Sequence, residues 1–140
     1  AGADEITAAG TTSGDASDRD PDAATTSSRL PALKYLSLLV GDFGTDRGIS
    51  RVFERASEFV ATAGEEGDGV LVHCANGSNR SVAVVTALLM QPPHGLRLCE
   101  AYAEVKRRRR GANPLTDNRR ELFAFETRIF GTNSMTEEEW

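Results

Sequence analysis

The sequence predicts an α/β fold in which helices flank a central sheet. Two observations predict it: short apolar runs typical of buried strands alternate along the chain with longer segments whose apolar residues recur at helical spacing. The chain has 140 residues, of which 39% are hydrophobic, enough for one compact domain and too few for a second independent core. We therefore expect a single folded unit.

The amino-terminal segment, residues 1–29, is not expected to contribute much to the core. It is rich in Ala, Thr, Ser, Asp and Gly, a composition typical of low-complexity or disordered segments. Residues 2–9 are the one apolar-leaning stretch within it and can supply a short strand. Continuous folded structure is expected from about residue 30 onward.

The first clear strand is predicted over residues 33–40, a mostly apolar run that leads into a loop over 42–48. A helix is predicted next, with Ser50 as its amino-terminal cap and Gly64 near its carboxyl end. Its apolar residues recur three and four positions apart, as in an amphipathic helix: Val52, Phe53, Ala56, Phe59, Val60 and Ala63.

The second half of the chain predicts one more strand and three helices. The strand is Val70–Val72, and the helix after it spans 81–90 and ends before two prolines. Pro114 separates the last two helices, whose apolar faces contain Leu98, Tyr102 and Val105 in one, and Leu122, Phe125 and Ile129 in the other. Residues 132–140 have no apolar period and are expected to form a flexible tail.

Composition argues against several classes of function. A net charge of −5 does not favour nucleic acid or an anionic membrane as a partner. No apolar run approaches the roughly 20 residues that span a bilayer, and the amino terminus lacks the pattern of a secretory signal. The two cysteines, Cys74 and Cys99, suit a reducing compartment, the cytoplasm or nucleus. His94 has no ligand at metal-binding spacing, so neither a metal nor another cofactor is expected.

The segment from His73 to Ser81 reads His-Cys-Ala-Asn-Gly-Ser-Asn-Arg-Ser and lies between a predicted strand and a predicted helix. A tight turn in this position aims consecutive backbone N–H groups and the positive end of the helix at one point, which can bind a phosphate dianion. Gly77 gives the turn its backbone freedom. The remaining loop residues are small enough to leave the amides accessible: Ala75, Asn76, Ser78 and Asn79.

Four side chains of this segment carry candidate chemical roles. Arg80 offers a planar fork for two phosphoryl oxygens. The positive field of the loop lowers the pKa of Cys74, so that its nucleophilic thiolate forms near neutral pH. His73, at the end of a buried strand, is expected to hold the loop through hydrogen bonds. Ser81 is either a simple helix-start residue or a member of the site.

The pattern His-Cys-x-x-Gly-x-x-Arg-Ser resembles the active-site motif of cysteine-based protein tyrosine phosphatases, and the flanking sequence resembles their dual-specificity branch over about residues 33–130. The resemblance implies a three-layer phosphatase-like fold with a central, mostly parallel sheet, formed by a catalytic domain over residues 30–131. It also implies that the Ser81 hydroxyl stabilises the thiolate as it leaves the phospho-enzyme. The matching flanks are Tyr35-Leu36, Asp42, Phe53–Ala56, Val70–Val72, Ala87–Met90, Ala101-Tyr102, Val105-Lys106 and Pro114.

The resemblance further implies a general acid, an Asp on a loop about thirty residues before the cysteine. Asp42 has that place, and its offset from Tyr35 matches the family, so it is favoured over its rival Asp46. A carboxylic acid is the group expected to protonate the departing oxygen of a phosphate ester. The alternative for either Asp is an ordinary turn residue beside Gly.

The chain departs from the family pattern at several points. Asn79 replaces a common Ser, Leu115 stands where Asn often follows the proline, and Asn118 occupies a usually aromatic position of the last helix. The family core also has a strand-and-helix region before Tyr35, for which only residues 2–9 are available. The sheet is therefore expected to be truncated at its amino-terminal side, which leaves two alternatives: the chain is a fragment, or another chain completes the sheet edge.

The leading hypothesis is a protein phosphatase that hydrolyses phosphotyrosine and phosphoserine or phosphothreonine through a cysteinyl-phosphate intermediate. One alternative is a catalytically weak, phosphate-binding pseudophosphatase. Another is a phosphatase acting on a phosphoinositide or an RNA 5′-phosphate, with the basic run Lys106–Arg110 as the contact. The simpler interpretation of that run is a helix end whose charges face water. The loop itself has no Lys, whereas lipid-directed relatives place lysines there.

Overall fold

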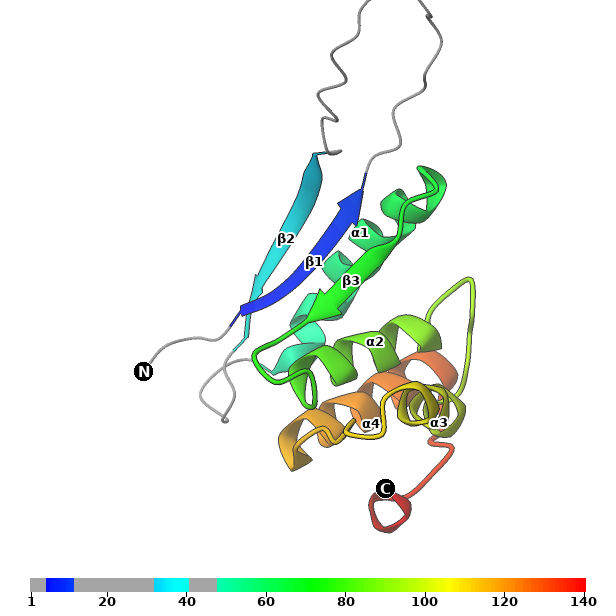
Figure 1. Ribbon diagram of the computed structural model, residues 1–140. Coiled ribbons are helices and arrows are strands. Elements are labelled where there is room, and N and C mark those ends of the chain that lie inside the picture. Colours follow the sequence, from blue (N-terminus) through cyan, green and yellow to red (C-terminus); the bar gives the residue numbers. More distant parts are fainter. Residues whose placement is uncertain (1–4, 12–31, 41–47) are drawn as a thin grey trace, which may run out of the picture.

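The computed structural model of the chain describes residues 32–40 and 48–140 in full and the backbone of residues 5–11. The described part is an α/β structure, as predicted, with a small sheet and four α-helices (Figure 1). In chain order the elements are β1 (Glu5–Thr11), β2 (Leu33–Leu39), the 3-10 turn η1 (Ile49–Val52), α1 (Phe53–Glu65), β3 (Val70–His73), α2 (Arg80–Met90), α3 (Leu98–Arg108), α4 (Thr116–Phe130) and the 3-10 turn η2 (Glu137–Glu139).

The three strands lie in the order β2-β1-β3. The central strand β1, close to the short strand allowed at residues 2–9, pairs antiparallel with both neighbours. Ala9 lies opposite Tyr35 of β2 and opposite Leu71 of β3. The prediction of a mostly parallel sheet is wrong for the described strands. β2 and β3 run in the same direction, but β1 lies between them and is antiparallel to both.

The helices cover one face of the sheet. Leu38, on the covered face, is 2% exposed, whereas Tyr35 and Leu71 are 64% and 65% exposed. Tyr35 and Leu71 both pair with Ala9 of β1, and side chains at paired positions project from the same face of a sheet. The described residues therefore form two layers in place of the expected three, because no described helix covers Tyr35 and Leu71.

The central helix α2 packs against the other three helices and against β3. Its residues Ala83, Ala87 and Met90 have no exposed surface, and Phe53 of α1 meets Phe125 of α4 edge to face with ring centroids 4.9 Å apart. Ser50 does not cap α1 as predicted. It lies in η1, one turn earlier, and its hydroxyl donates a hydrogen bond to the Glu121 carboxylate.

At β3 the described sheet has an open edge. A mostly apolar cavity of about 640 Å³ lies beside β3, between it and the helices α2 and α3, with walls that include Leu71, Val72, Val82, Val85, Leu89 and Val105. The described sheet is therefore short of strands, as the sequence led us to expect. Among the described helices, none is both long enough and apolar enough to cross a membrane.

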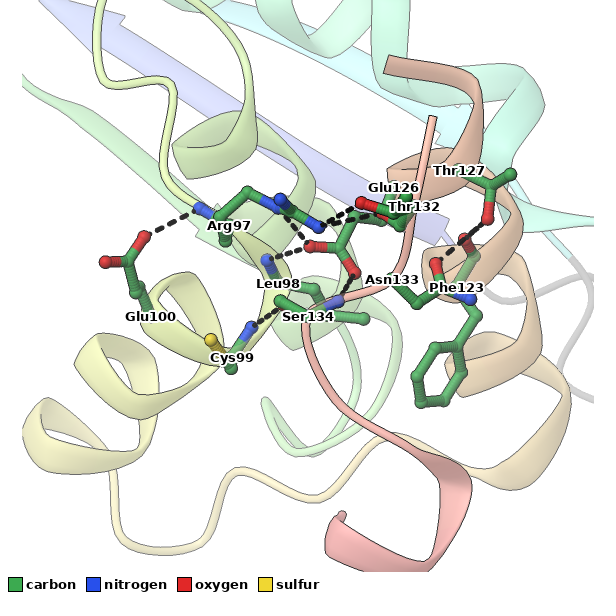
Figure 2. A network of polar contacts seen from close by, with 10 residues as sticks. All are labelled: Arg97, Leu98, Cys99, Glu100, Phe123, Glu126, Thr127, Thr132, Asn133 and Ser134. Carbon is green, nitrogen blue, oxygen red and sulfur yellow. Dashed lines mark hydrogen bonds and ion pairs between the residues drawn. The ribbon is translucent and has the colours of Figure 1, made fainter. Parts of the chain in front are cut away.

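A buried carboxylate joins α3 to α4. Glu126, which has no exposed surface, accepts hydrogen bonds from Arg97 Nε at 2.8 Å and from the backbone N–H groups of Leu98 and Ser134 at 2.9 Å. Figure 2 shows these donors converging on the carboxylate from two sides. Burial would raise the pKa of Glu126, but these hydrogen bonds together lower it below its usual value.

Residues 132–140, expected to form a flexible tail, pack on the helices in the structure. The Ser134 hydroxyl accepts a hydrogen bond of 3.0 Å from the backbone N–H of Cys99 (Figure 2). The Trp140 ring stacks on Tyr102 with centroids 4.3 Å apart, and the Arg119 guanidinium lies 5.3 Å from its centroid. Aromatic stacking and a cation above the ring both stabilise this position of the chain end.

Replacing Glu126 by Leu is expected to lower the free energy of unfolding by about 3 kcal/mol, because it removes the carboxylate partner of Arg97 and leaves the N–H groups of Leu98 and Ser134 without their acceptor. Chemical denaturation of the variant and the wild type measures the difference. Glu138→Leu, at an exposed position, is the matched control and should change stability by less than about 0.5 kcal/mol. Equal effects of the two substitutions would contradict this role of Glu126.

Candidate active site

The loop of residues 74–79 joins the carboxyl end of β3 to the first residue of α2, Arg80 (Figure 1). Within it, Gly77 has a φ of +64°, in the left-handed region that side chains disfavour. A Cβ at this position would also lie 2.8 Å from the Arg109 guanidinium. The positive φ therefore favours glycine here, and a side chain at this position would also displace the Arg109 guanidinium.

Cys74 lies at the base of the loop and is 7% exposed. Its Sγ is 3.3 Å from the Oγ of Ser81, in the first turn of α2. Burial raises the pKa of the Cys74 thiol, but hydrogen bonds from the Ser81 hydroxyl and from the backbone N–H groups of Ser81, Gly77 and Asn76 outweigh it and lower the pKa to about 7. At neutral pH a substantial fraction of this thiol is therefore the nucleophilic thiolate.

Arg80 is 2% exposed and Ser81 is 4% exposed, so both side chains are held inside the domain beside the loop. A hollow of about 390 Å³ opens here, with Cys74, Asn76, Ser78, Asn79, Arg80 and Asn113 among its walls. Ala75 and Asn76 are exposed, and the next three loop residues are half-buried. Cys74 and Arg80 thus both line this hollow, and the Ser81 hydroxyl contacts the Cys74 thiol from the first turn of α2. A nucleophile beside loop N–H groups is an arrangement able to bind an oxyanion.

The outer side of the loop is held by residues that the sequence did not assign to the site. The Arg109 guanidinium donates hydrogen bonds to the backbone carbonyls of Asn76, at 3.2 Å, and Gly77. The backbone N–H of Asn113 donates to the carbonyl of Ser78 at 2.8 Å. Three consecutive carbonyls of the loop are therefore bound from the segment that follows α3.

Asn79 extends this contact through its side chain. Its Oδ1 accepts hydrogen bonds from the backbone N–H of Leu115 at 2.8 Å and from the side-chain amide of Asn118 at 2.7 Å. Asn79, Leu115 and Asn118 are the three positions at which the sequence departs from the family pattern, and the structure joins them. The sequence signal for this contact is that Asn79 and Asn118 are both departures to asparagine. No rule of sequence spacing links two residues that are 39 positions apart in the chain, so the contact was not predicted.

The basic run Lys106–Arg110 is largely engaged within the domain. Lys106 donates to the Ala112 carbonyl at 2.7 Å, and Arg107 and Arg108 pair with Glu104 at 2.9 and 2.6 Å. Together with Arg109, four of the five cations therefore have partners in the described structure. This is closer to the helix-end interpretation than to a docking patch, although Arg109 binds the loop rather than water.

Of the other predicted members of the site, the structure describes His73 and does not describe the two candidates for the general acid. The His73 side chain is exposed, because the alternation along β3 puts it on the open face with Leu71 rather than in the core. Its supporting role stays a prediction. Asp42 and its rival Asp46 both lie outside the described residues.

The rate of Cys74 alkylation by iodoacetamide is expected to rise with pH through about 7, because the thiolate is the reactive form and its pKa lies there. Ser81→Ala removes a hydroxyl that lowers this pKa, so its midpoint should move upward by about one unit. Mass spectrometry in a Cys99→Ser background measures the rate at Cys74 alone. An unchanged midpoint in Ser81→Ala would show that the hydroxyl does not stabilise the thiolate.

Comparison with known proteins identifies relatives of this sequence. Residues 16–128 match the family model described as dual specificity phosphatase, catalytic domain. The chain is 42% identical over 80 residues to human dual specificity protein phosphatase 9, covering 57% of this chain and 21% of that protein. It is 39% identical over 69 residues to dual specificity protein phosphatase 1 of Arabidopsis thaliana, covering 49% and 34%.

A third relative covers more of this chain. Mouse dual specificity protein phosphatase 14 is 31% identical over 105 residues, which is 75% of this chain and 52% of the mouse protein. The chain therefore spans 21% to 52% of the lengths of these three relatives.

Proposed function

Because the chain belongs to the family of dual specificity phosphatase catalytic domains, we propose that its loop hydrolyses phosphate monoesters of protein substrates through a cysteinyl-phosphate intermediate. One observation carries the proposal: a buried thiol with a pKa of about 7 lies at the base of a loop whose N–H groups and whose Arg80 can surround an oxyanion. The proposed substrates are proteins carrying phosphotyrosine, phosphoserine or phosphothreonine.

In the first step the Cys74 thiolate attacks phosphorus, so that an S–P bond forms and the P–O bond to the substrate breaks. Arg80 and the loop N–H groups stabilise the charge on the equatorial oxygens. Asp42 gives its proton to the departing oxygen, which leaves as a neutral hydroxyl group. This assignment of Asp42 rests on the family resemblance, with Asp46 as the alternative.

In the second step water attacks the phosphorus of the intermediate and the S–P bond breaks. Asp42, now a carboxylate, accepts the proton of the water. The sulfur leaves as a thiolate, and the Ser81 hydroxyl, 3.3 Å from Sγ, is placed to donate a hydrogen bond to it. No residue in this scheme requires a metal or another cofactor.

The alternatives receive less support from the site. A pseudophosphatase would keep the loop and lose the chemistry, yet this chain has both Cys74 and Arg80. A phosphoinositide or RNA 5′-phosphate substrate would use the basic run 106–110, and four of its five cations already have partners within the domain. A thiolate enzyme also needs a reducing environment, which supports the cytoplasm or nucleus as its location.

The direct test is hydrolysis of an aryl phosphate by the purified chain in the presence of a metal chelator. We expect measurable turnover with the chelator present, since the loop binds oxyanions without a metal, and inhibition by orthovanadate in a separate reaction without the chelator, which would itself bind vanadate. Turnover that requires an added metal would contradict the thiolate mechanism. Binding of a phosphotyrosine peptide without turnover would favour the pseudophosphatase.

Asp42→Ala is expected to slow the hydrolysis of esters with poor leaving groups by about 10²–10³-fold, because an alkoxide needs the proton more than an activated phenoxide does. The ratio of kcat/KM values for a phosphoserine peptide and for p-nitrophenyl phosphate measures this dependence. Asp46→Ala, at the rival position of the predicted loop, is measured in parallel. If Asp46→Ala lowers the ratio and Asp42→Ala does not, Asp46 is the general acid.

A further inference from the structure

Arg109 lies outside the segment from His73 to Ser81, and its guanidinium donates two hydrogen bonds to the backbone of the loop. It follows the last residue of α3, and its own backbone is extended, with φ −131° and ψ 94°. This change of direction lets the guanidinium reach across to the loop, where it donates to the carbonyl oxygens of Asn76 and Gly77. A guanidinium can bind two acceptors at once in a fixed geometry, which an ammonium group cannot.

The two carbonyls that Arg109 binds determine where two N–H groups point. In a trans peptide the C=O and the N–H lie in one plane and point in opposite directions, and the only cis peptide among the described residues is Pro92-Pro93. A carbonyl of Asn76 held outward therefore aims the N–H of Gly77 inward. That N–H is one of the donors to Cys74 Sγ. In the same way, the direction of the Gly77 carbonyl determines the direction of the Ser78 N–H, because both belong to one trans peptide.

We propose that Arg109 is a positioning residue of the phosphate loop: it holds the carbonyls of Asn76 and Gly77 outward and so directs the N–H groups of Gly77 and Ser78 toward the thiolate and the bound phosphoryl group. The part that concerns the phosphoryl group rests on the proposed function. The part that concerns the thiolate rests on the contacts of the loop with Arg109 and with Cys74 and does not depend on the proposed function.

The fit around Gly77 supports a specific role for this arginine. The Arg109 guanidinium lies close enough to the Gly77 backbone that a Cβ would be only 2.8 Å from Nη2 and 3.2 Å from Cζ. The three preceding cations of the run contact Ala112 and Glu104 instead of the loop. Among residues 106–109, Arg109 is therefore the residue whose side chain binds the loop carbonyls, and it can do so because α3 ends at the residue before it.

The test compares three variants of the full chain: Arg109→Ala, Arg109→Lys and Arg110→Ala. Arg109→Lys keeps the charge and loses the two-acceptor fork, whereas Arg110→Ala removes the same charge from the adjacent exposed position. Two readouts need no turnover: the pH midpoint of Cys74 alkylation by iodoacetamide, and the dissociation constant for inorganic phosphate measured by calorimetry. Thermal melting confirms that each variant is folded.

In Arg109→Ala we expect the alkylation midpoint to rise by about 0.5–1 pH unit and phosphate to bind about tenfold more weakly. Arg109→Lys should resemble Arg109→Ala, and Arg110→Ala should stay within about twofold of the wild type. Equal shifts in Arg109→Ala and Arg110→Ala would overturn the proposal in favour of a general charge effect. Wild-type behaviour of Arg109→Lys would overturn it as well, since the charge would then suffice.

These readouts separate this inference from the proposed function. If the wild type hydrolyses no phosphate ester but the Arg109 variants shift as expected, the phosphatase proposal fails and the positioning role stands. If the wild type is an active phosphatase and Arg109→Ala leaves both readouts unchanged, the positioning role fails alone. If Arg109→Ala does not melt cooperatively, Arg109→Lys, which retains the positive charge, is compared with Arg110→Ala alone, and wild-type readouts in a folded Arg109→Lys still overturn the proposal.

Discussion

Cys74→Ser is expected to abolish aryl phosphate hydrolysis, with a loss of about 10⁵-fold or more, while leaving phosphate binding in place. The reason is the difference between the two nucleophiles: the loop lowers the pKa of the Cys74 thiol to about 7, whereas a serine hydroxyl remains protonated at that pH. The loop N–H groups and Arg80 are unchanged in this variant, so the hydrogen-bond donors proposed to bind the phosphoryl oxyanion are still present. Steady-state kinetics measure the first effect, and calorimetric titration with a phosphotyrosine peptide measures the second.

Cys99→Ser is the matched control, because Cys99 lies on α3 and its backbone, rather than its thiol, contacts Ser134. This variant should hydrolyse the substrate at nearly the wild-type rate. Residual turnover in Cys74→Ser, above that of a buffer blank and insensitive to vanadate, would show that a different nucleophile or a contaminating enzyme acts. Loss of peptide binding in Cys74→Ser would instead show that the thiolate is needed to organise the loop.

The loop was predictable because its determinants are local. A strand that ends at His73, a turn that needs Gly77 and a helix that starts at Arg80 lie within a few residues of one another. Such a strand–turn–helix brings the N–H groups of its loop and the positive end of its helix close to one point, which a local pattern in the sequence can predict. The contact between Cys74 and Ser81 follows from the same short segment.

The features that sequence reasoning did not find are those that depend on distant pairing. Arg109 binds carbonyls more than thirty residues earlier, and from the sequence it is one of several adjacent cations with a simpler interpretation. The outward direction of His73 depends on which face of the sheet the helices cover. The direction of β1 depends on pairing with two strands that follow it in the chain, which no local pattern specifies.

Arg80→Lys is expected to lower kcat by about 10³-fold while keeping the fold. Arg80 is 2% exposed and lines the same hollow as Cys74, so its side chain is held by packing, and the proposed mechanism has its planar guanidinium bind two phosphoryl oxygens. A lysine supplies one point of contact, and burial penalises its charged form. The loss should fall mainly on kcat, because charge on the equatorial oxygens is best matched in the transition state.

The control for Arg80→Lys is Arg120→Lys on α4, where the side chain is 63% exposed and a planar fork is not needed for catalysis. Steady-state kinetics with p-nitrophenyl phosphate separate kcat from KM for both variants, and thermal melting checks that each is folded. A loss confined to KM would mean that Arg80 binds the ground state and the transition state equally. Wild-type kcat in a folded Arg80→Lys would mean that charge alone suffices at this position, and the two-point contact with the phosphoryl group would have to be abandoned.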